Sequence, residues 1–170
     1  YFVSPSSLGP ALIALGAQVK LVSASGQRMI SAEKFFVSPQ NEVSRETALL
    51  PNEILTEIHV PAAHGVKNAT YEIRQKEALD WPLVAASVAI RMQGSNVSKA
   101  SIVLGHVAPT PWPATKASEA LNGKALTPEN IAQAADLAGD GATPLSGNAY
   151  KVKLAKVAVK RALLEASGKA

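Results

Sequence analysis

The densest run of charged, polar and aromatic side chains in this 170-residue sequence extends from Tyr71 to Leu83. On a β-strand, successive side chains point to opposite faces of the sheet. The run therefore predicts one face with Tyr71, Ile73 and Gln75 and another with Glu72, Arg74 and Lys76. A fixed cation at Arg74 or Lys76 would stabilise an anionic or electron-rich ligand placed beside it.

The same run contains Asp80-Trp81-Pro82, which predicts a rigid turn ahead of an apolar strand. Such a turn would present Trp81 to an aromatic ring or to a protein partner. The alternative interpretation is structural: a half-buried strand with an exposed charged face and a tryptophan in the core. The residue types alone leave both interpretations open.

Several kinds of site have no support in the sequence. The absence of cysteine excludes disulfides, cysteine nucleophiles and thiolate-bound zinc or iron–sulfur centres within this chain. His59, His64 and His106 are far apart and form no metal-ligand motif. The glycines at 139 and 141 lack the context of a phosphate-binding loop, and no serine stands in a Gly-x-Ser-x-Gly motif.

Composition indicates an ordinary globular protein, with 47% hydrophobic residues and a formal net charge of +4. No stretch is long and apolar enough to span a membrane, and the first residues do not resemble a signal peptide. A start at Tyr1 suggests a cut or processed chain. Basic residues recur near the C-terminus, at Lys151, Lys153, Lys156, Lys160 and Arg161; they predict a solvated helix face or a docking surface for an acidic partner. Nucleic-acid binding is disfavoured because no aromatic residues are interleaved with them.

The predicted helices and strands that would position these residues fall into two groups, one before residue 62 and one after a linker. Before residue 62, spacing and turn residues predict a helix over 7–15, a hairpin of strands over 17–23 and 27–30, one helical turn over 31–36, an irregular loop over 37–47 and a strand over 53–60. Residues 62–67 are the best candidate for an interdomain linker.

After the linker, three strand-like runs over 69–75, 84–92 and 99–107 predict an antiparallel meander. Helices are predicted over 112–121, 127–137 and 149–166, with Thr127 as the N-cap and Pro128 in the first helical position. Strands followed by a separate set of helices indicate an α+β fold: a partial subdomain of helix, hairpin and strand, then a three-stranded antiparallel sheet with a C-terminal helical layer.

Five segments in order resemble the FAD-binding subunit of the molybdenum hydroxylases, the family of xanthine dehydrogenases, carbon monoxide dehydrogenase and bacterial aldehyde oxidoreductases. Residues 3–17 resemble its HPSDLAPALxALGA segment, 49–61 its L.P.EIL..I.VP element, 71–84 its Y.K.R.R strand, 104–112 its LGGVAPxPxR turn and 148–155 its last helix. The string from Lys76 to Val84 is especially similar to the aldehyde oxidoreductase branch.

This resemblance implies that residues 1–62 are the C-terminal part of the second FAD-binding subdomain and residues 66–170 the C-terminal flavoprotein domain. The phosphate-binding first subdomain would lie upstream. The resemblance places six residues near the flavin: Ser7, Leu49, Leu50, Arg74, Lys76 and Trp81. Two departures stand out, because the family's acidic residue is Ser7 here and its common lysine aligns nearest Glu72.

The resemblance further implies an oxidoreductase role as part of a heterotrimer, with no catalytic residue and no metal ligand in this chain. FAD would pass electrons from iron–sulfur centres in a small subunit to an acceptor, and a molybdenum cofactor in a large subunit would hydroxylate the substrate. The rival hypothesis is a non-catalytic module that docks subunits and binds no cofactor by itself. The chain is expected to be soluble, in the bacterial cytoplasm or periplasm; substrate and electron acceptor are left open.

Overall fold

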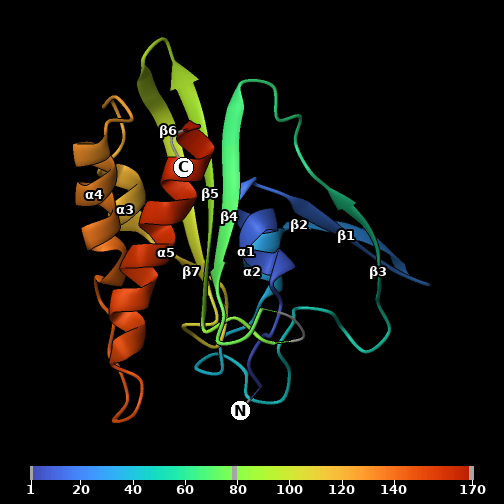
Figure 1. The fold of residues 1–170 in the computed structure, drawn as a ribbon. Helices are drawn as coiled ribbons and strands as arrows, with labels where there is room; N and C mark the ends of the chain where they lie inside the picture. Colours follow the sequence, from blue (N-terminus) through green and yellow to red (C-terminus); the bar gives the residue numbers. More distant parts are fainter. Residues whose placement is uncertain (1, 78–79, 169–170) are drawn as a thin grey trace.

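The computed structural model describes residues 2–77 and 80–168 as two antiparallel sheets and a set of helices (Figure 1). The first part of the chain forms a small sheet of three strands, and the second part forms a larger sheet of four. Most of the helices cover one face of the larger sheet, and the small sheet lies on its other side (Figure 1). The α+β class predicted from the sequence is confirmed.

Local sequence explains the elements of the first part. Helix α1 (Leu8–Ala14) begins where the Ser6 hydroxyl accepts a hydrogen bond of 2.9 Å from the backbone N–H of Gly9. It is followed by Gly16, whose positive φ of 73° suits a helix C-terminus. Strands β1 (Gln18–Ser23) and β2 (Gly26–Ser31) form the predicted hairpin, and helix α2 (Ala32–Phe35) follows.

Strand β3 (Ile54–His59) completes the small sheet by pairing antiparallel with β1, which gives the order β2-β1-β3. The sheet is covered unevenly. Val19 and Leu21 of β1 are buried, whereas Ile54 is 69% exposed and Ile58 is 43% exposed. The small sheet therefore buries its central strand and leaves apolar side chains of its edge strand in solvent.

The larger sheet is built mainly from hairpin connections. Its strands are β4 (Val66–Ile73), β5 (Val84–Gln93), β6 (Asn96–Gly105) and the two-residue β7 (Trp112–Pro113), in the order β4-β5-β6-β7. The predicted meander is present, with β7 added at its edge, so the predicted start of a helix at residue 112 is wrong and α3 begins only at Thr115. The turn between β5 and β6 is only two residues long, and Gly94 supplies its positive φ of 61°.

The helical layer consists of α3 (Thr115–Glu119), α4 (Pro128–Asp136), a 3-10 turn (Leu137–Gly139) and α5 (Tyr150–Ser167). The Thr127 side chain caps α4 as predicted, by accepting a hydrogen bond of 3.3 Å from the backbone N–H of Asn130. The helices bury Leu121, Ile131 and Leu163 completely against the sheet. This face holds the main core of the protein.

The opposite face of the larger sheet carries α1. Ile13 and Ala14 of α1 form a second core with Ala89 and Val103 of the sheet. The approach is close, because a Cβ added to Gly105 would lie 2.9 Å from Cγ of Pro10. Strand β5 is thus buried on both faces over residues 84–90, and it joins the two parts of the chain.

Two searches of the molecule gave negative results. Within residues 2–77 and 80–168, no helix has both the length and the apolar character needed to cross a membrane. The same residues contain no group of three or more histidine, aspartate or glutamate side chains placed to bind a metal ion.

Candidate functional site

The end of β4 differs from the prediction in one respect. Tyr71 and Ile73 pack against the main core as the alternation predicts, but the strand ends at Ile73. Arg74 and Lys76 therefore follow the strand and lie outside it. The predicted strand over 69–75 is wrong in its last two residues, because the chain turns away from β5 there.

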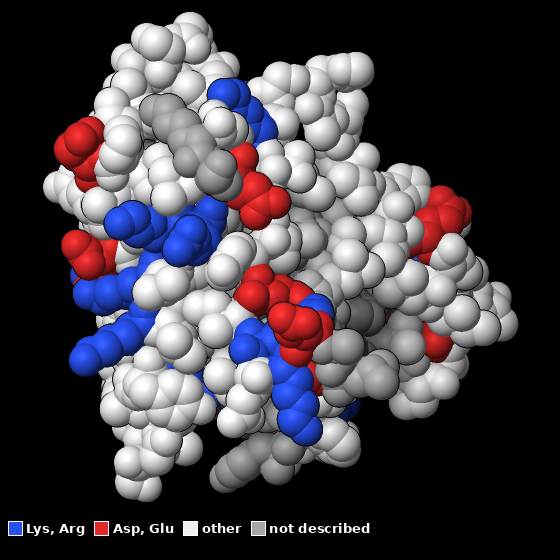
Figure 2. Space-filling view, viewed as in Figure 1, with Lys and Arg blue, Asp and Glu red and all other residues white. Residues whose placement is uncertain are grey.

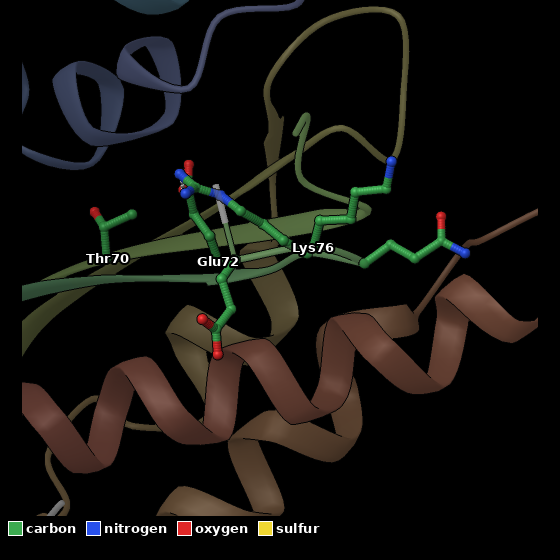
Figure 3. A pocket seen from close by; sticks show the side chains of 6 residues that line it. Thr70, Glu72 and Lys76 are labelled. Atoms are coloured by element: carbon green, nitrogen blue, oxygen red, sulfur yellow. Dashed lines mark hydrogen bonds and ion pairs between the residues drawn. The ribbon is translucent and has the colours of Figure 1, made fainter. Parts of the chain in front are cut away.

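A shallow groove of about 500 Å³ lies at this strand end. It is lined by Thr70, Glu72, Arg74, Gln75, Lys76 and Glu77. Charges of both signs gather in this region (Figure 2). The guanidinium of Arg74 is paired with the Glu72 carboxylate, whereas the Lys76 side chain extends away from Glu72 (Figure 3). The groove can thus offer a cation to an anionic group, and it contains acidic groups as well.

The turn after the groove exposes Trp81. The backbone N–H of Lys76 donates a hydrogen bond of 3.1 Å to Oδ2 of Asp80, and the N–H of Leu83 donates one of 2.8 Å to the carbonyl of Ile73. Between these two bonds, Pro82 is buried and Trp81 is 65% exposed. The alternative of a core tryptophan is therefore wrong. Residues 78 and 79 of this segment lie outside the described residues.

His106 links two of the predicted site residues. Its Nε2 lies 3.3 Å from Oγ of Ser7, and its ring centroid lies 6.4 Å from that of Trp81, with the two planes tilted by 53°. Nζ of Lys151, in α5, donates a hydrogen bond of 2.9 Å to the His106 carbonyl. Side chains from the start of α1 and from the turn before β5 thus meet at the turn that follows β6.

The surroundings of His106 favour its neutral form. Burial is the main cause and lowers the pKa of the imidazole below its ordinary value of 6.5; the Glu72 carboxylate raises the pKa, and the Lys151 ammonium lowers it. Because the pKa is depressed on folding, the unfolded chain binds this proton more readily. The contribution of neutral His106 to stability is complete above pH 6.5 and declines as pH falls below that value.

Leu49 and Leu50 lie on a different segment, which leads into β3 of the small sheet (Figure 1). Arg28 of β2 donates to both carboxylate oxygens of Glu53, at 2.7 and 2.8 Å, and to the carbonyl of Ala48 at 2.9 Å. Glu53 in turn accepts a hydrogen bond of 2.9 Å from the N–H of Leu50. These bonds fix the segment and leave the Leu50 side chain 42% exposed.

The bond to Arg28 is the main cause that lowers the pKa of Glu53 to about 2, and the bond from the Leu50 N–H lowers it further. The carboxylate is therefore charged throughout the neutral range, and the 48–53 segment keeps its shape there.

The six predicted site residues thus fall into three places: Ser7 and Trp81 at His106, Arg74 and Lys76 at the groove, and Leu49 and Leu50 ahead of β3. Sequence reasoning missed His106, and one signal was available. The LGGVAPxPxR pattern has glycine where this chain has His106, and His106 has a positive φ of 63°. A glycine in such a pattern often marks a left-handed backbone position.

These residues fit the ring system of FAD better than its pyrophosphate. An exposed aromatic face and nearby cations suit an electron-rich ring that gains negative charge on reduction. Pyrophosphate needs a cluster of backbone N–H groups at a glycine-rich loop and a helix N-terminus. The sequence contains no such loop, so this chain offers side chains for the ring and no cradle for the phosphates.

Two family models match adjoining parts of the chain. Residues 3–63 match the FAD binding domain in molybdopterin dehydrogenase, and residues 69–166 match the CO dehydrogenase flavoprotein C-terminal domain. The carbon monoxide dehydrogenase medium chain of Hydrogenophaga pseudoflava is 36% identical over 164 residues, which cover 94% of this chain and 55% of the relative. The aldehyde oxidoreductase FAD-binding subunit PaoB of Escherichia coli K12 is 28% identical over 167 residues, covering 98% and 49%.

Solved structures agree with the sequence matches. A structure of carbon monoxide dehydrogenase from Hydrogenophaga pseudoflava has a TM-score of 0.85 at 34% identity, covering 97% of this chain and 57% of that chain. Quinoline 2-oxidoreductase from Pseudomonas putida 86 has a TM-score of 0.81 at 27% identity, covering 98% and 58%. The chain spans about half the length of the curated relatives it matches. By its sequence, its two domain matches and its fold, the chain belongs to the family of FAD-binding subunits of molybdenum hydroxylases.

Proposed function

We propose that this chain is the part of an FAD-binding subunit that forms a wall beside the flavin ring in a molybdenum-dependent oxidoreductase of the aldehyde or xanthine type. The observation that carries the proposal is the placement of Trp81: a large aromatic side chain, 65% exposed, on the turn that follows the groove lined by Arg74 and Lys76. When bound, FAD supplies the redox chemistry, and the protein supplies orientation and electrostatics.

Each proposed contact has a physical role. Arg74 and Lys76 stabilise negative charge on the ring side of the cofactor. Trp81 packs against an aromatic or apolar surface, and Ser7 contributes a hydroxyl from the start of α1. Leu49 and Leu50 exclude water from a ring edge, on the segment that Arg28 and Glu53 hold in place. We assign residues 1–62 to a second FAD-binding subdomain and residues 66–170 to the C-terminal flavoprotein domain.

The proposed partners follow from the relatives, which are medium chains and FAD-binding subunits of larger enzymes. They are a large subunit with a molybdenum cofactor, a small subunit with iron–sulfur clusters and an upstream FAD-binding subdomain that holds the phosphates. In this scheme the 170-residue chain alone is inactive.

A second candidate function, subunit docking without a cofactor, is favoured by the outer surface of α5. Lys153, Lys160 and Arg161 are exposed on this helix beside Val157, which is 47% exposed. Basic side chains gather over the helix (Figure 2). A basic surface with an apolar centre suits an acidic partner surface.

Two purified forms test the ring-wall proposal, namely the 170-residue chain and the same chain extended upstream as in its longer relatives. We expect flavin absorbance in the extended form and none in the short form. Stoichiometric FAD in the short form would overturn the assignment, because it would require a phosphate site that the sequence does not contain.

Paired charge removals separate the two candidate functions. In the extended protein, changing Arg74 and Lys76 together to Ala is expected to lower the flavin reduction potential or weaken FAD retention, because two cations near the ring are lost. The matched control, Lys153→Ala with Lys160→Ala, removes the same charge from α5. Unchanged potential and retention in the first variant would refute the ring-wall role; lost subunit association in the second alone would favour docking.

A further inference from the structure

The turn after β6 is tied by three hydrogen bonds to two other segments of the chain. The backbone N–H of Ser4 donates a hydrogen bond of 2.7 Å to the carbonyl of Pro109. Oγ of Ser7 lies 3.3 Å from Nε2 of His106, and Lys151 donates a hydrogen bond of 2.9 Å to the His106 carbonyl. The turn thus joins the start of α1 to the start of α5, two places nearly 150 residues apart in sequence.

His106 has a conformation that needs an explanation. Its φ of 63° lies in the left-handed region, and it is the one residue other than glycine with a positive φ in the described part of the chain. Such a residue is disfavoured relative to glycine and persists where surrounding contacts determine it. Here those contacts involve both the backbone, through Lys151, and the side chain, through Ser7.

The charges around the imidazole come from two elements. Lys151 of α5 repels a protonated ring, and Glu72 of β4 attracts one, but Glu72 is already paired with Arg74. Ser7, from the start of α1, and Trp81, from the turn before β5, carry no charge. A protonated His106 would therefore be half-buried without an unshared counter-ion, which favours movement of the charged ring toward solvent. The Ser7 hydroxyl can pair with either form of the ring, because it can donate to a bare ring nitrogen and accept from a ring N–H.

We propose that His106 is a positioning residue that holds Ser7 and Trp81 on one surface through its imidazole, and that the charged ring, which has no unshared counter-ion at this half-buried place, swings toward solvent and releases them. The relevance of this surface to a flavin rests on the proposed function. The joining of Ser7, His106 and Trp81 rests on the geometry of the turn alone.

The first test uses the 170-residue chain with Trp112 changed to Phe, so that Trp81 is the sole tryptophan. Its fluorescence is followed from about pH 8 to about pH 5, the range in which histidine titrates. Release changes the surroundings of the indole, so we expect its emission to change along a one-proton curve with a midpoint below 6.5, the ordinary histidine value. The curve should vanish in His106→Gln. His59 and His64 remain in that variant, so the loss of the curve would assign the titration to His106. An unchanged curve in His106→Gln would overturn the proposal.

Two further variants separate the imidazole from the backbone. His106→Gly accepts the left-handed conformation without strain but removes the bond to Ser7. His106→Asn also tolerates this conformation and keeps a hydrogen-bonding side chain that does not titrate. In the extended, FAD-containing protein we expect FAD retention to be weakened by His106→Gly and restored by His106→Asn, without the pH dependence of the native protein.

The outcomes distinguish the two proposals. If Trp81 titrates with His106 but FAD retention is the same in all variants at every pH, the positioning role stands and the ring-wall function falls. If Trp81 does not titrate with His106, the positioning role falls, whatever the flavin does. Equal FAD loss in His106→Gly and His106→Asn would also count against it, because the hydrogen bond to Ser7 would then be irrelevant.

Discussion

The two sheets of this protein use apolar residues differently. In the larger sheet, β5 is covered on one face by α5 and on the other by α1, and residues 84–90 of this strand are all buried. In the small sheet, β3 has Ile54 and Ile58 in solvent, and residue 60 just beyond it is an exposed valine. The larger sheet is thus buried on both faces at its centre, whereas the small sheet buries only its central strand.

The second core joins the two parts of the chain. Its members Ile13, Ala14 and Ala32 come from the first part of the chain, but Ala89 and Val103 belong to the larger sheet. The first part of the chain therefore buries its apolar side chains against side chains of the second part. Changes in the main core should destabilise the whole protein, and changes at the contact between the parts should mainly release the first part.

The largest expected effect is in the helical layer. Leu163 is fully buried, so Leu163→Ala leaves a cavity and should lower the free energy of unfolding by about 2–5 kcal/mol. Ile54→Ala in the exposed part of the small sheet should change it by less than about 0.5 kcal/mol. Urea unfolding followed by circular dichroism measures both. Similar losses in the two variants would break the contrast between the sheets.

The next effect concerns the contact between α1 and the larger sheet. Gly105→Ala places a methyl group 2.9 Å from Cγ of Pro10 and 3.3 Å from Cβ of Ala85. Overpacking at this site should cost about 1–3 kcal/mol. Hydrogen exchange should show faster opening of α1 and β1 with β5 still protected. The control is Gly147→Ala, because a Cβ there meets nothing within 4 Å; matching behaviour of the two variants would contradict the tight contact.

A smaller effect compares two capping residues. Thr127 caps the nine-residue α4, and Thr127→Ala should cost about 1 kcal/mol of global stability. The Ser31 hydroxyl accepts the same kind of bond, at 3.3 Å, from the N–H of Lys34, but Ser31 caps the four-residue α2 in the first part of the chain. We expect Ser31→Ala to lower the thermal unfolding midpoint less than Thr127→Ala does. A larger effect of Ser31→Ala would mean that the first part of the chain limits the stability of the protein.

The smallest effect is confined to acid. Because folding lowers the pKa of Glu53 from 4.5 to about 2, its contribution to stability is present above pH 4.5 and is lost as pH falls to about 2. Glu53→Gln should show a flatter stability profile across that window, and Arg28→Ala should flatten it in the same way. If Glu53→Gln retains the native slope, the bond between Arg28 and Glu53 does not fix the segment that carries Leu50.

Much of the fold could be predicted because its signals are local. Thr127 and Pro128 mark the start of α4, Gly16 follows the end of α1, and the hairpin strands show the alternation of sheets. Long-range relations could not be predicted in this way. The pairing of β1 with β3 crosses more than thirty residues, and the two-residue β7 has no sequence pattern of its own.

The candidate site was harder to predict for the same reason. Arg74 and Lys76 are close in sequence and line one groove, and their contact with a flavin stays a prediction. The association of Ser7 with His106 spans 99 residues, and only the folded chain brings them together. Glu53 is a further example, because its partner Arg28 lies on β2, across the small sheet from the segment that they hold.

The packing of Ile13 and Ala14 against Ala89 and Val103 has a consequence for synthesis on the ribosome. A chain is made from its N-terminus, so α1 emerges before the strands against which it packs, with Ile13 and Ala14 uncovered. This apolar surface of α1 stays exposed until β5 and β6 have formed their hairpin. The larger sheet, built from neighbouring strands, can form quickly once it emerges. The order of synthesis therefore makes the contact between the two parts of the chain one of the last to form.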